Sequence, residues 1–180
     1  NRTIKIHLKG PAGIIEASLD LPDGLKHDPA NFRPRGIALV AHPHPLLGGT
    51  MDNKVAQTLA RTFAQLNYVT VRPNFRGVGA TEGVHDDGKG ETQDLLAVIA
   101  WMKDSFGWQE IPELEGQGWP LLVAELPLVI AGFSFGSYVS SYVVKHLEEM
   151  NMPPERLIMV GSATGKWDVA PVPKNTIVIH

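Results

Sequence analysis

Short apolar runs alternate along the chain with longer stretches in which apolar residues recur every three or four positions. The short runs are typical of buried strands, and the longer stretches are typical of amphipathic helices. We expect strands at residues 3–8, 14–19, 36–41, 68–71, 128–131, 157–160 and 176–179, and helices at about residues 52–66, 91–106 and 134–150. This alternation predicts an α/β fold of three layers, with a mostly parallel central sheet and helices on both faces.

Residues 107–126 fit neither period. The segment carries Trp108 and Trp119 among several prolines and glycines, and it is longer than most connections. We interpret it as an excursion from the core: a plain surface loop or, alternatively, a partial cap over a site or a surface for a partner. The chain shows no internal repeat and no domain boundary, so residues 1–180 are expected to form a single domain.

Composition narrows the range of functions. Lys and Arg total 16 against 19 Asp and Glu, a net charge of −3, and the basic residues are scattered, so we expect neither nucleic acid nor a membrane as a partner. The lack of cysteine in the sequence excludes disulfides, thiolate metal sites and a cysteine nucleophile. No apolar run approaches the roughly 18 residues of a membrane span, and the first residues do not resemble a signal peptide. A soluble, cytoplasmic protein is therefore expected.

The sequence Gly132-Phe-Ser-Phe-Gly136 stands between the strand predicted at 128–131 and the helix that follows it. A serine hydroxyl is a poor nucleophile unless a tight turn projects it towards a base, and a G-x-S-x-G between strand and helix builds such a turn. The glycines let this turn pass close to neighbouring strands. We therefore expect Ser134 to be a catalytic nucleophile. The alternative is a serine that only caps the helix.

A second loop is predicted to complete an oxyanion hole. Acyl transfer needs two N–H donors that face the oxygen on which charge develops, and one of them follows the nucleophile, at Phe135. In the loop His42-Pro-His-Pro-Leu-Leu-Gly-Gly49, Pro43 and Pro45 have no N–H to offer. Because the two prolines stiffen this loop, we predict the backbone N–H of His44 as the other donor.

The sequence argues against a zinc site and against a dinucleotide site. His42 and His44 are spaced like the first pair of a binuclear zinc hydrolase, but leucines occupy positions 46 and 47, where that pattern needs Asp and His. We expect instead that the side chain of His42 satisfies hydrogen bonds beneath the loop. A dinucleotide motif starting at Gly77 would need glycine where Glu82 stands. No metal and no other cofactor is expected.

Three segments resemble motifs of the α/β-hydrolase superfamily, in the order in which they occur there. His42–Met51 reads H-P-H-P-x-x-G-G-T-M, as in small bacterial members that lack a lid and are similar to dienelactone hydrolase, and Gly132–Gly136 resembles the nucleophile turn. Asn74–Thr81 is similar to the superfamily's D-x-R-G-x-G-x-S turn, with Asn74 and Thr81 in place of Asp and Ser. The resemblance spans nearly the whole chain and is weakest in the excursion.

The resemblance implies an α/β-hydrolase fold with Ser134 as the nucleophile. It also implies that the N–H groups of Phe135 and His44 are the oxyanion donors, and that Arg76 anchors its turn. Substrate choice in this superfamily resides in loops, which the sequence predicts poorly.

The rest of a catalytic triad is expected beyond the given residues. The superfamily's chain order is serine, acid, histidine, and the acid normally follows the strand predicted here at 176–179. The sequence ends at His180, so we expect the acid, the histidine, and the last strand and helix to follow it. His146 is too far along its helix to reach Ser134 at about 1.5 Å per residue. Asp168 could act only as an acid displaced to the preceding loop, where a solvated turn is the simpler interpretation.

The predicted function is that of a serine hydrolase that cleaves a small carboxylic ester or thioester through an acyl-serine intermediate. Its partner would be a small-molecule acyl substrate, and the given residues alone are expected to be nearly inactive without the triad histidine. The alternative is a catalytically inactive, hydrolase-like scaffold that binds a ligand or a partner. The sequence predicts neither the physiological acyl group nor the oligomeric state.

Overall fold

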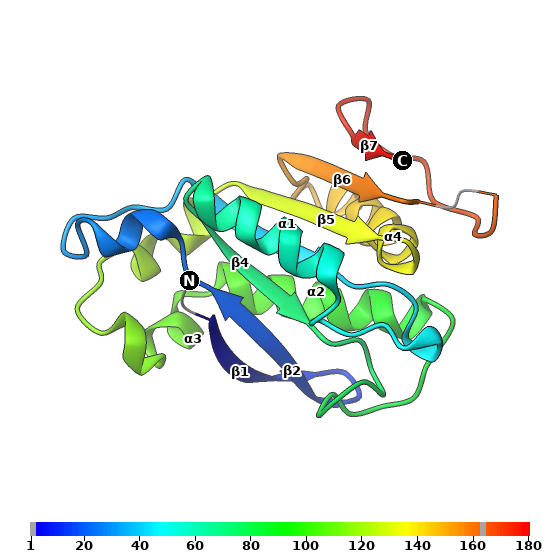
Figure 1. Ribbon diagram of the computed structural model, residues 1–180, viewed down its shortest axis with the longest axis horizontal. Helices are drawn as coiled ribbons and strands as arrows, with labels where there is room; N and C mark the ends of the chain where they lie inside the picture. Colours follow the sequence, from blue (N-terminus) through cyan, green and yellow to red (C-terminus); the bar gives the residue numbers. More distant parts are fainter. Residues whose placement is uncertain (1–2, 163–164) are drawn as a thin grey trace.

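The structure, a computed structural model, describes residues 3–162 and 165–180. In this part of the chain seven strands form one sheet in the order β1-β2-β4-β3-β5-β6-β7 (Figure 1). The strands are β1 (Thr3–Gly10), β2 (Gly13–Asp20), β3 (Gly36–Ala41), β4 (Tyr68–Pro73), β5 (Leu128–Phe133), β6 (Arg156–Val160) and β7 (Ile177–Ile179). β2 pairs antiparallel with β1 and with β4. The other neighbouring pairs are parallel: β4 with β3, β3 with β5, β5 with β6, and β6 with β7.

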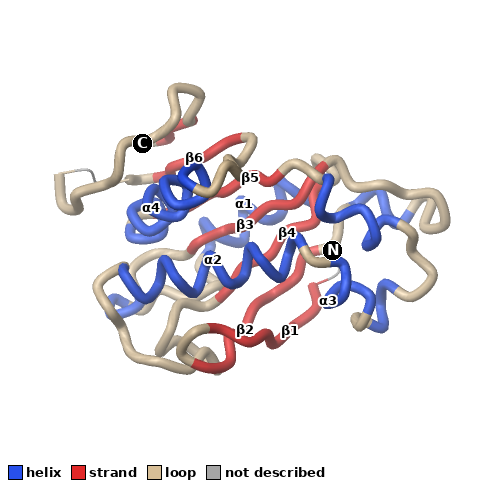
Figure 2. The backbone as a smooth tube through the Cα atoms, turned by 180° about the vertical axis from the view of Figure 1, so that it is seen from behind, coloured by secondary structure: helices blue, strands red, loops and turns tan. Residues whose placement is uncertain are grey.

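Helices cover both faces of the sheet. The long ones are α1 (Lys54–Gln65), α2 (Lys89–Lys103) and α4 (Phe135–Glu149). α1 lies on one face, and α2 and α4 lie on the other (Figure 2). None of the helices that the structure describes is both long enough and apolar enough to cross a lipid bilayer. The predicted three-layer α/β architecture is confirmed.

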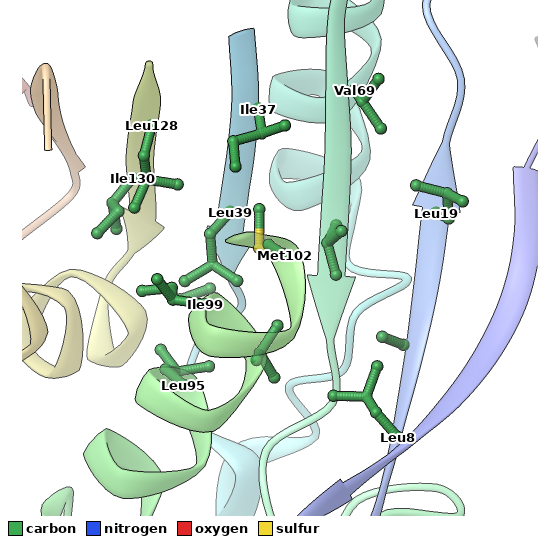
Figure 3. Close-up of a cluster of buried hydrophobic side chains, with 14 of the residues drawn as sticks. Leu8, Leu19, Ile37, Leu39, Val69, Leu95, Ile99, Met102, Leu128 and Ile130 are labelled. Atoms are coloured by element: carbon green, nitrogen blue, oxygen red, sulfur yellow. The ribbon is translucent and has the colours of Figure 1, made fainter. Parts of the chain in front are cut away.

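The central strand β3 shows why the sheet is buried on both faces. Successive side chains of a strand point to opposite faces, so Ile37 and Leu39 join the core cluster beneath α2 and α4, whereas Ala38 and Val40 join the cluster beneath α1. Figure 3 shows Ile37 and Leu39 on the side of α2. A strand that is covered twice must be apolar throughout, which explains the continuous apolar run at 36–41.

The excursion at 107–126 folds into short helical turns: α3 (Ser105–Gln109), η3 (Pro112–Leu114) and η4 (Trp119–Glu125). Trp108 and Trp119 are both buried, with 5.5 Å between their ring centroids, so they belong to the core and not to a surface loop. The segment follows the end of α2 and precedes β5, which places it where the parallel strands begin (Figure 1). A cap over Ser134 would have to lie at the opposite end of the sheet, where these strands finish.

Candidate active site

Ser134 stands at the sharp bend between β5 and α4. Its backbone has φ 55° and ψ −118°, a left-handed conformation that residues other than glycine rarely adopt. The N–H of Ser134 donates to the carbonyl oxygen of Val160 on β6 (2.9 Å), and its own carbonyl accepts from the N–H (2.9 Å) and the hydroxyl (2.6 Å) of Ser137. The Ser134 side chain is half-buried and makes no capping hydrogen bond to α4. It is therefore not a serine that merely caps the helix.

Close packing explains the two glycines of the motif. A Cβ atom on Gly136 would overlap the carbonyl oxygens of Ala41 and His42 at the end of β3, and one on Gly132 would overlap the carbonyl of Gly136. These obstacles are backbone atoms, which cannot rotate away as a side chain can. The nucleophile turn therefore rests directly against the loop His42–Gly49, which we call the His–Pro loop.

Gly136→Ala is expected to lower the free energy of unfolding by about 1–3 kcal/mol, because the added methyl group must push α4 away from β3. The same displacement should misplace Ser134 and slow its labelling by a fluorophosphonate. Denaturant unfolding measures the first effect. Gly118→Ala is the matched control, since a Cβ atom there meets no atom within 4 Å. Equal stability of the two variants would contradict the close packing.

The His–Pro loop folds back on itself beside the nucleophile turn. Pro45–Leu47 form one 3-10 turn, and the carbonyl of His44 accepts hydrogen bonds from the N–H groups of Leu47 (3.1 Å) and Gly49 (3.0 Å). The rings of His44 and Phe135 lie 4.8 Å apart between centroids, so the two predicted oxyanion donors belong to segments in contact. Within the described residues, neither the N–H of His44 nor that of Phe135 has a hydrogen-bond acceptor. The predicted role as oxyanion donors requires both N–H groups to be without such an acceptor.

His42 is buried, and the backbone engages both of its ring nitrogens. Nδ1 lies 2.7 Å from the carbonyl oxygen of Pro43, and Nε2 accepts from the N–H of Phe75 (3.0 Å), partners that assign the proton of a neutral ring to Nδ1. Burial lowers the pKa of His42 from 6.5 to about 4, although the bond to Pro43 opposes this shift. With neither nitrogen free, His42 is not placed to ligate a metal. Its predicted role beneath the loop is confirmed.

Acidification is expected to destabilise the fold through His42. Its pKa is about 4 in the folded chain against 6.5 for an unburied histidine, so the unfolded chain binds more protons between these values. The stability that the neutral His42 ring contributes is complete above the unfolded pKa of 6.5, and it is lost as the pH falls towards the folded pKa of about 4. Between pH 7 and pH 5 the loss is roughly 2 kcal/mol, which denaturant unfolding at the two pH values measures.

A variant isolates this contribution. In His42→Gln the loss of unfolding free energy that His42 causes between pH 7 and pH 5 should vanish. His27→Gln changes an exposed histidine, so this variant should show the same loss as the wild type. The same slope in His42→Gln as in the wild type would show that the buried ring is not its source.

Five aromatic rings gather beside the nucleophile turn, and we call them the aromatic cluster: His44, His85, Phe135, Tyr138 and Trp167. Trp167 stacks on His44 and on Tyr138, each at 6.1 Å between centroids, and meets Phe135 edge-on at 5.8 Å. Burial, and to a smaller extent His85, lowers the pKa of His44, which favours a neutral ring. The cluster thus joins the His–Pro loop to the nucleophile turn.

The β6–β7 connection carries Trp167 and is held against α4 by two hydrogen bonds. The hydroxyl of Tyr142 donates to the carbonyl oxygen of Asp168 (2.7 Å), and the N–H of Ala170 donates to Oγ of Ser141 (3.0 Å). Asp168 itself is exposed and is held through its backbone. This placement agrees with a solvated turn rather than with a triad acid.

His85 lies beside the nucleophile turn although no sequence pattern singles it out. Its ring centroid is 5.6 Å from that of Phe135. Nδ1 lies 3.2 Å from the fully buried carboxylate of Glu91, and Nε2 lies 3.2 Å from that of Asp87. Both nitrogens thus lie near carboxylates, although the buried Nδ1 makes no hydrogen bond within the described residues.

An ion pair holds the glycine-rich turn that follows β4. Nε and one terminal nitrogen of Arg76 donate to the two carboxylate oxygens of Asp94 on α2 (2.9 and 2.7 Å), and this bond raises the pKa of Arg76. Asn74 donates to the carboxylate of Glu16 and accepts from the N–H of Met51, both at 2.8 Å. Arg76 therefore anchors its turn, as the resemblance implies.

No protein-family model matches the chain. The crystal structure of XC6422 from Xanthomonas campestris, an α/β serine hydrolase without a lid, is 32% identical with a TM-score of 0.77, and the match covers 99% of this chain and 70% of that one. An α/β serine hydrolase homologue from Coxiella burnetii is 31% identical with a TM-score of 0.69, over 97% and 72% of the two chains. The uncharacterized protein RP471 of Rickettsia prowazekii is 33% identical over 147 residues, which are 82% of this chain and 52% of that protein.

By this identity and coverage the chain belongs to the α/β serine hydrolases. The two solved structures named above are bacterial proteins, and they confirm the resemblance inferred from the three motifs. The chain spans about half the length of the curated relative from Rickettsia.

Proposed function

We propose that the protein is a serine esterase in which Ser134 attacks the carbonyl carbon of a small carboxylic ester or thioester. The observation that carries this proposal is the left-handed backbone of Ser134 after β5, together with the N–H groups of His44 and Phe135 on adjoining segments, which have no acceptor among the residues that the structure describes. Such strain persists only where the surroundings over-determine it, and it clusters at functional sites. A strained serine beside two available N–H donors suits acyl transfer.

In the proposed reaction, Oγ of Ser134 bonds to the carbonyl carbon while its proton passes to a general base. The carbonyl oxygen becomes an oxyanion that the N–H groups of His44 and Phe135 stabilise, aided by the positive end of α4. Collapse of this intermediate expels the alcohol or thiol, which takes up the proton, and water then releases the acid from the acyl-serine. The proposed general base is a histidine, which in the superfamily's chain order comes after the serine and the acid.

The surroundings of Ser134 support a substrate with an apolar acyl group. Leu46 and Leu47 on the His–Pro loop are 68% and 75% exposed, and Val84, next to His85 of the aromatic cluster, is 80% exposed. Exposed apolar side chains that flank a polar reaction centre are typical of a ligand-binding surface. We therefore propose that this rim contacts the hydrocarbon part of the acyl group.

A fluorophosphonate probe on the full-length protein tests the proposal, because it bonds covalently to an activated serine. The proposal predicts labelling of the wild type and none of Ser134→Ala. Circular dichroism shows whether the variant is folded. A folded wild-type protein that takes no label would favour the second candidate function, a hydrolase-like scaffold that binds a ligand without chemistry.

A further inference from the structure

A groove lies outside the site of Ser134, between the start of α2, the exposed side of α4 and the turn that joins β1 to β2. Its volume is about 660 Å³, within the range of about 300–1,000 Å³ that small-molecule sites occupy. Ser134 is not among the residues that line it. The lining includes Pro11 and Ala12 of the turn, Lys89 and Gln93 of α2, and Tyr138 and Tyr142 of α4.

Two tyrosines form the aromatic wall of the groove. Tyr138 and Tyr142 lie one helical turn apart on α4, with 5.5 Å between their ring centroids and an angle of 76° between their planes. Tyr138 also packs against Phe135 at 5.7 Å, and its hydroxyl donates to the carbonyl oxygen of Asp87 (3.4 Å). Tyr138 is therefore shared by the groove and the aromatic cluster, and it separates the two. Half-buried rings of this kind bind planar apolar groups by stacking.

The charged groups that line the groove differ in whether they are already paired. Arg76 is engaged by Asp94. Asp86 is exposed and accepts a hydrogen bond from the N–H of Gly90 at the start of α2 (2.9 Å), which stabilises its carboxylate but leaves its negative charge in the lining. The ammonium group of Lys89 is exposed and has no ion-pair or hydrogen-bond partner in the part of the chain that the structure describes.

The remaining polar groups of the lining add no second strong charge. His146 lies 3.8 Å from the carboxylate of Glu149. The hydroxyl of Thr92 donates to the carbonyl of Gly88 (2.6 Å). The side chain of Gln93 is exposed and can hydrogen-bond to a ligand. A ligand in the groove would therefore meet an aromatic wall, the unpaired positive charge of Lys89, the amide of Gln93 and the carboxylate of Asp86, from which an anionic group must keep its distance.

From this arrangement we infer a second ligand site, distinct from that of Ser134, for an amphipathic anion with a planar aromatic body and a single carboxylate or sulfonate. The aromatic body lies against Tyr138 and Tyr142, and the anionic group faces Lys89. The site needs no covalent chemistry, and it stands whether or not the protein is an esterase.

The probe for this site is anilinonaphthalene sulfonate, an aromatic anion whose fluorescence rises when it leaves water. We expect the folded full-length protein to bind one equivalent. Lys89→Glu should weaken binding about tenfold, which corresponds to about 1.4 kcal/mol. Gln93→Trp, which fills the groove from the exposed side of α2, should weaken it at least as much. Lys54→Glu is the matched control, because Lys54 is an exposed lysine that begins α1 as Lys89 begins α2.

Two further measurements sharpen the test. One distinguishes the effect of charge on binding from the effect of shape, and the other distinguishes this groove from the site of Ser134. The neutral analogue phenylnaphthylamine should lose affinity in Gln93→Trp and keep it in Lys89→Glu. Protein labelled at Ser134 should bind the sulfonate as the unlabelled protein does. The inference is overturned if the wild type does not bind the dye, if Gln93→Trp binds it undiminished, if Lys89→Glu and Lys54→Glu behave alike, or if labelling at Ser134 blocks binding.

Discussion

Ser134→Ala should lower kcat of the full-length protein on a small ester such as p-nitrophenyl acetate by roughly 10⁴-fold or more, with KM changed only a few fold. In the proposed reaction the hydroxyl oxygen bonds to the substrate, so its loss removes the covalent route. The two proposed N–H donors and the proposed binding surface remain, which is why we expect KM to be largely kept. Steady-state kinetics with both proteins measures the ratio.

A serine on α4 provides the control. Ser140 is buried, and its hydroxyl has no hydrogen-bond partner within the described residues, so Ser140→Ala should change neither kcat nor KM appreciably. A similar loss in both variants would mean that α4 tolerates no substitution. Full activity of Ser134→Ala would mean that another group performs the reaction.

Arg76→Met is expected to lower the free energy of unfolding by about 3–5 kcal/mol, the largest effect on stability that we predict. The side chain of Arg76 is 13% exposed and that of Asp94 only 3%, so removal of the guanidinium leaves a buried carboxylate without its partner. Denaturant unfolding measures the loss. Arg76→Met combined with Asp94→Leu should recover much of it, because no charge then remains buried.

An ion pair whose cation is exposed gives the contrast. Lys5 lies 3.4 Å from Glu16 and is 58% exposed, and Glu16 keeps hydrogen bonds from Asn74 and Ala80 when Lys5 is replaced. Lys5→Met should therefore cost less than about 1 kcal/mol. If Arg76→Met costs as little as Lys5→Met, the pair with Asp94 does not anchor the turn.

The fold was predictable where local pattern and burial agree. The run at 36–41 is apolar throughout because helices cover β3 on both faces, and the motif Gly132–Gly136 depends on positions only two residues apart. The excursion at 107–126 was not predictable in the same way. Its turns are too short to show a helical period. Trp108 and Trp119 are buried, but they are not part of a repeating apolar pattern in the sequence.

The candidate site was predictable only in its local parts. Ser134, Phe135 and His44 follow from motifs, whereas His85 and Trp167 come from connections after two different strands and meet the nucleophile turn only in the folded chain. A lone histidine or tryptophan in a polar loop carries no periodic signal. The contact of five rings depends on the order of the strands in the sheet, which a single sequence indicates weakly.

Trapping the acyl-enzyme tests the central claim most directly. The full-length protein is mixed with p-nitrophenyl acetate, quenched in acid during turnover, digested and analysed by mass spectrometry. A covalent Ser134 intermediate predicts an acetyl group on the peptide that contains Gly132–Gly136, and none on that peptide from Ser134→Ala. Turnover with this peptide unmodified and an acetyl group on another residue would contradict it.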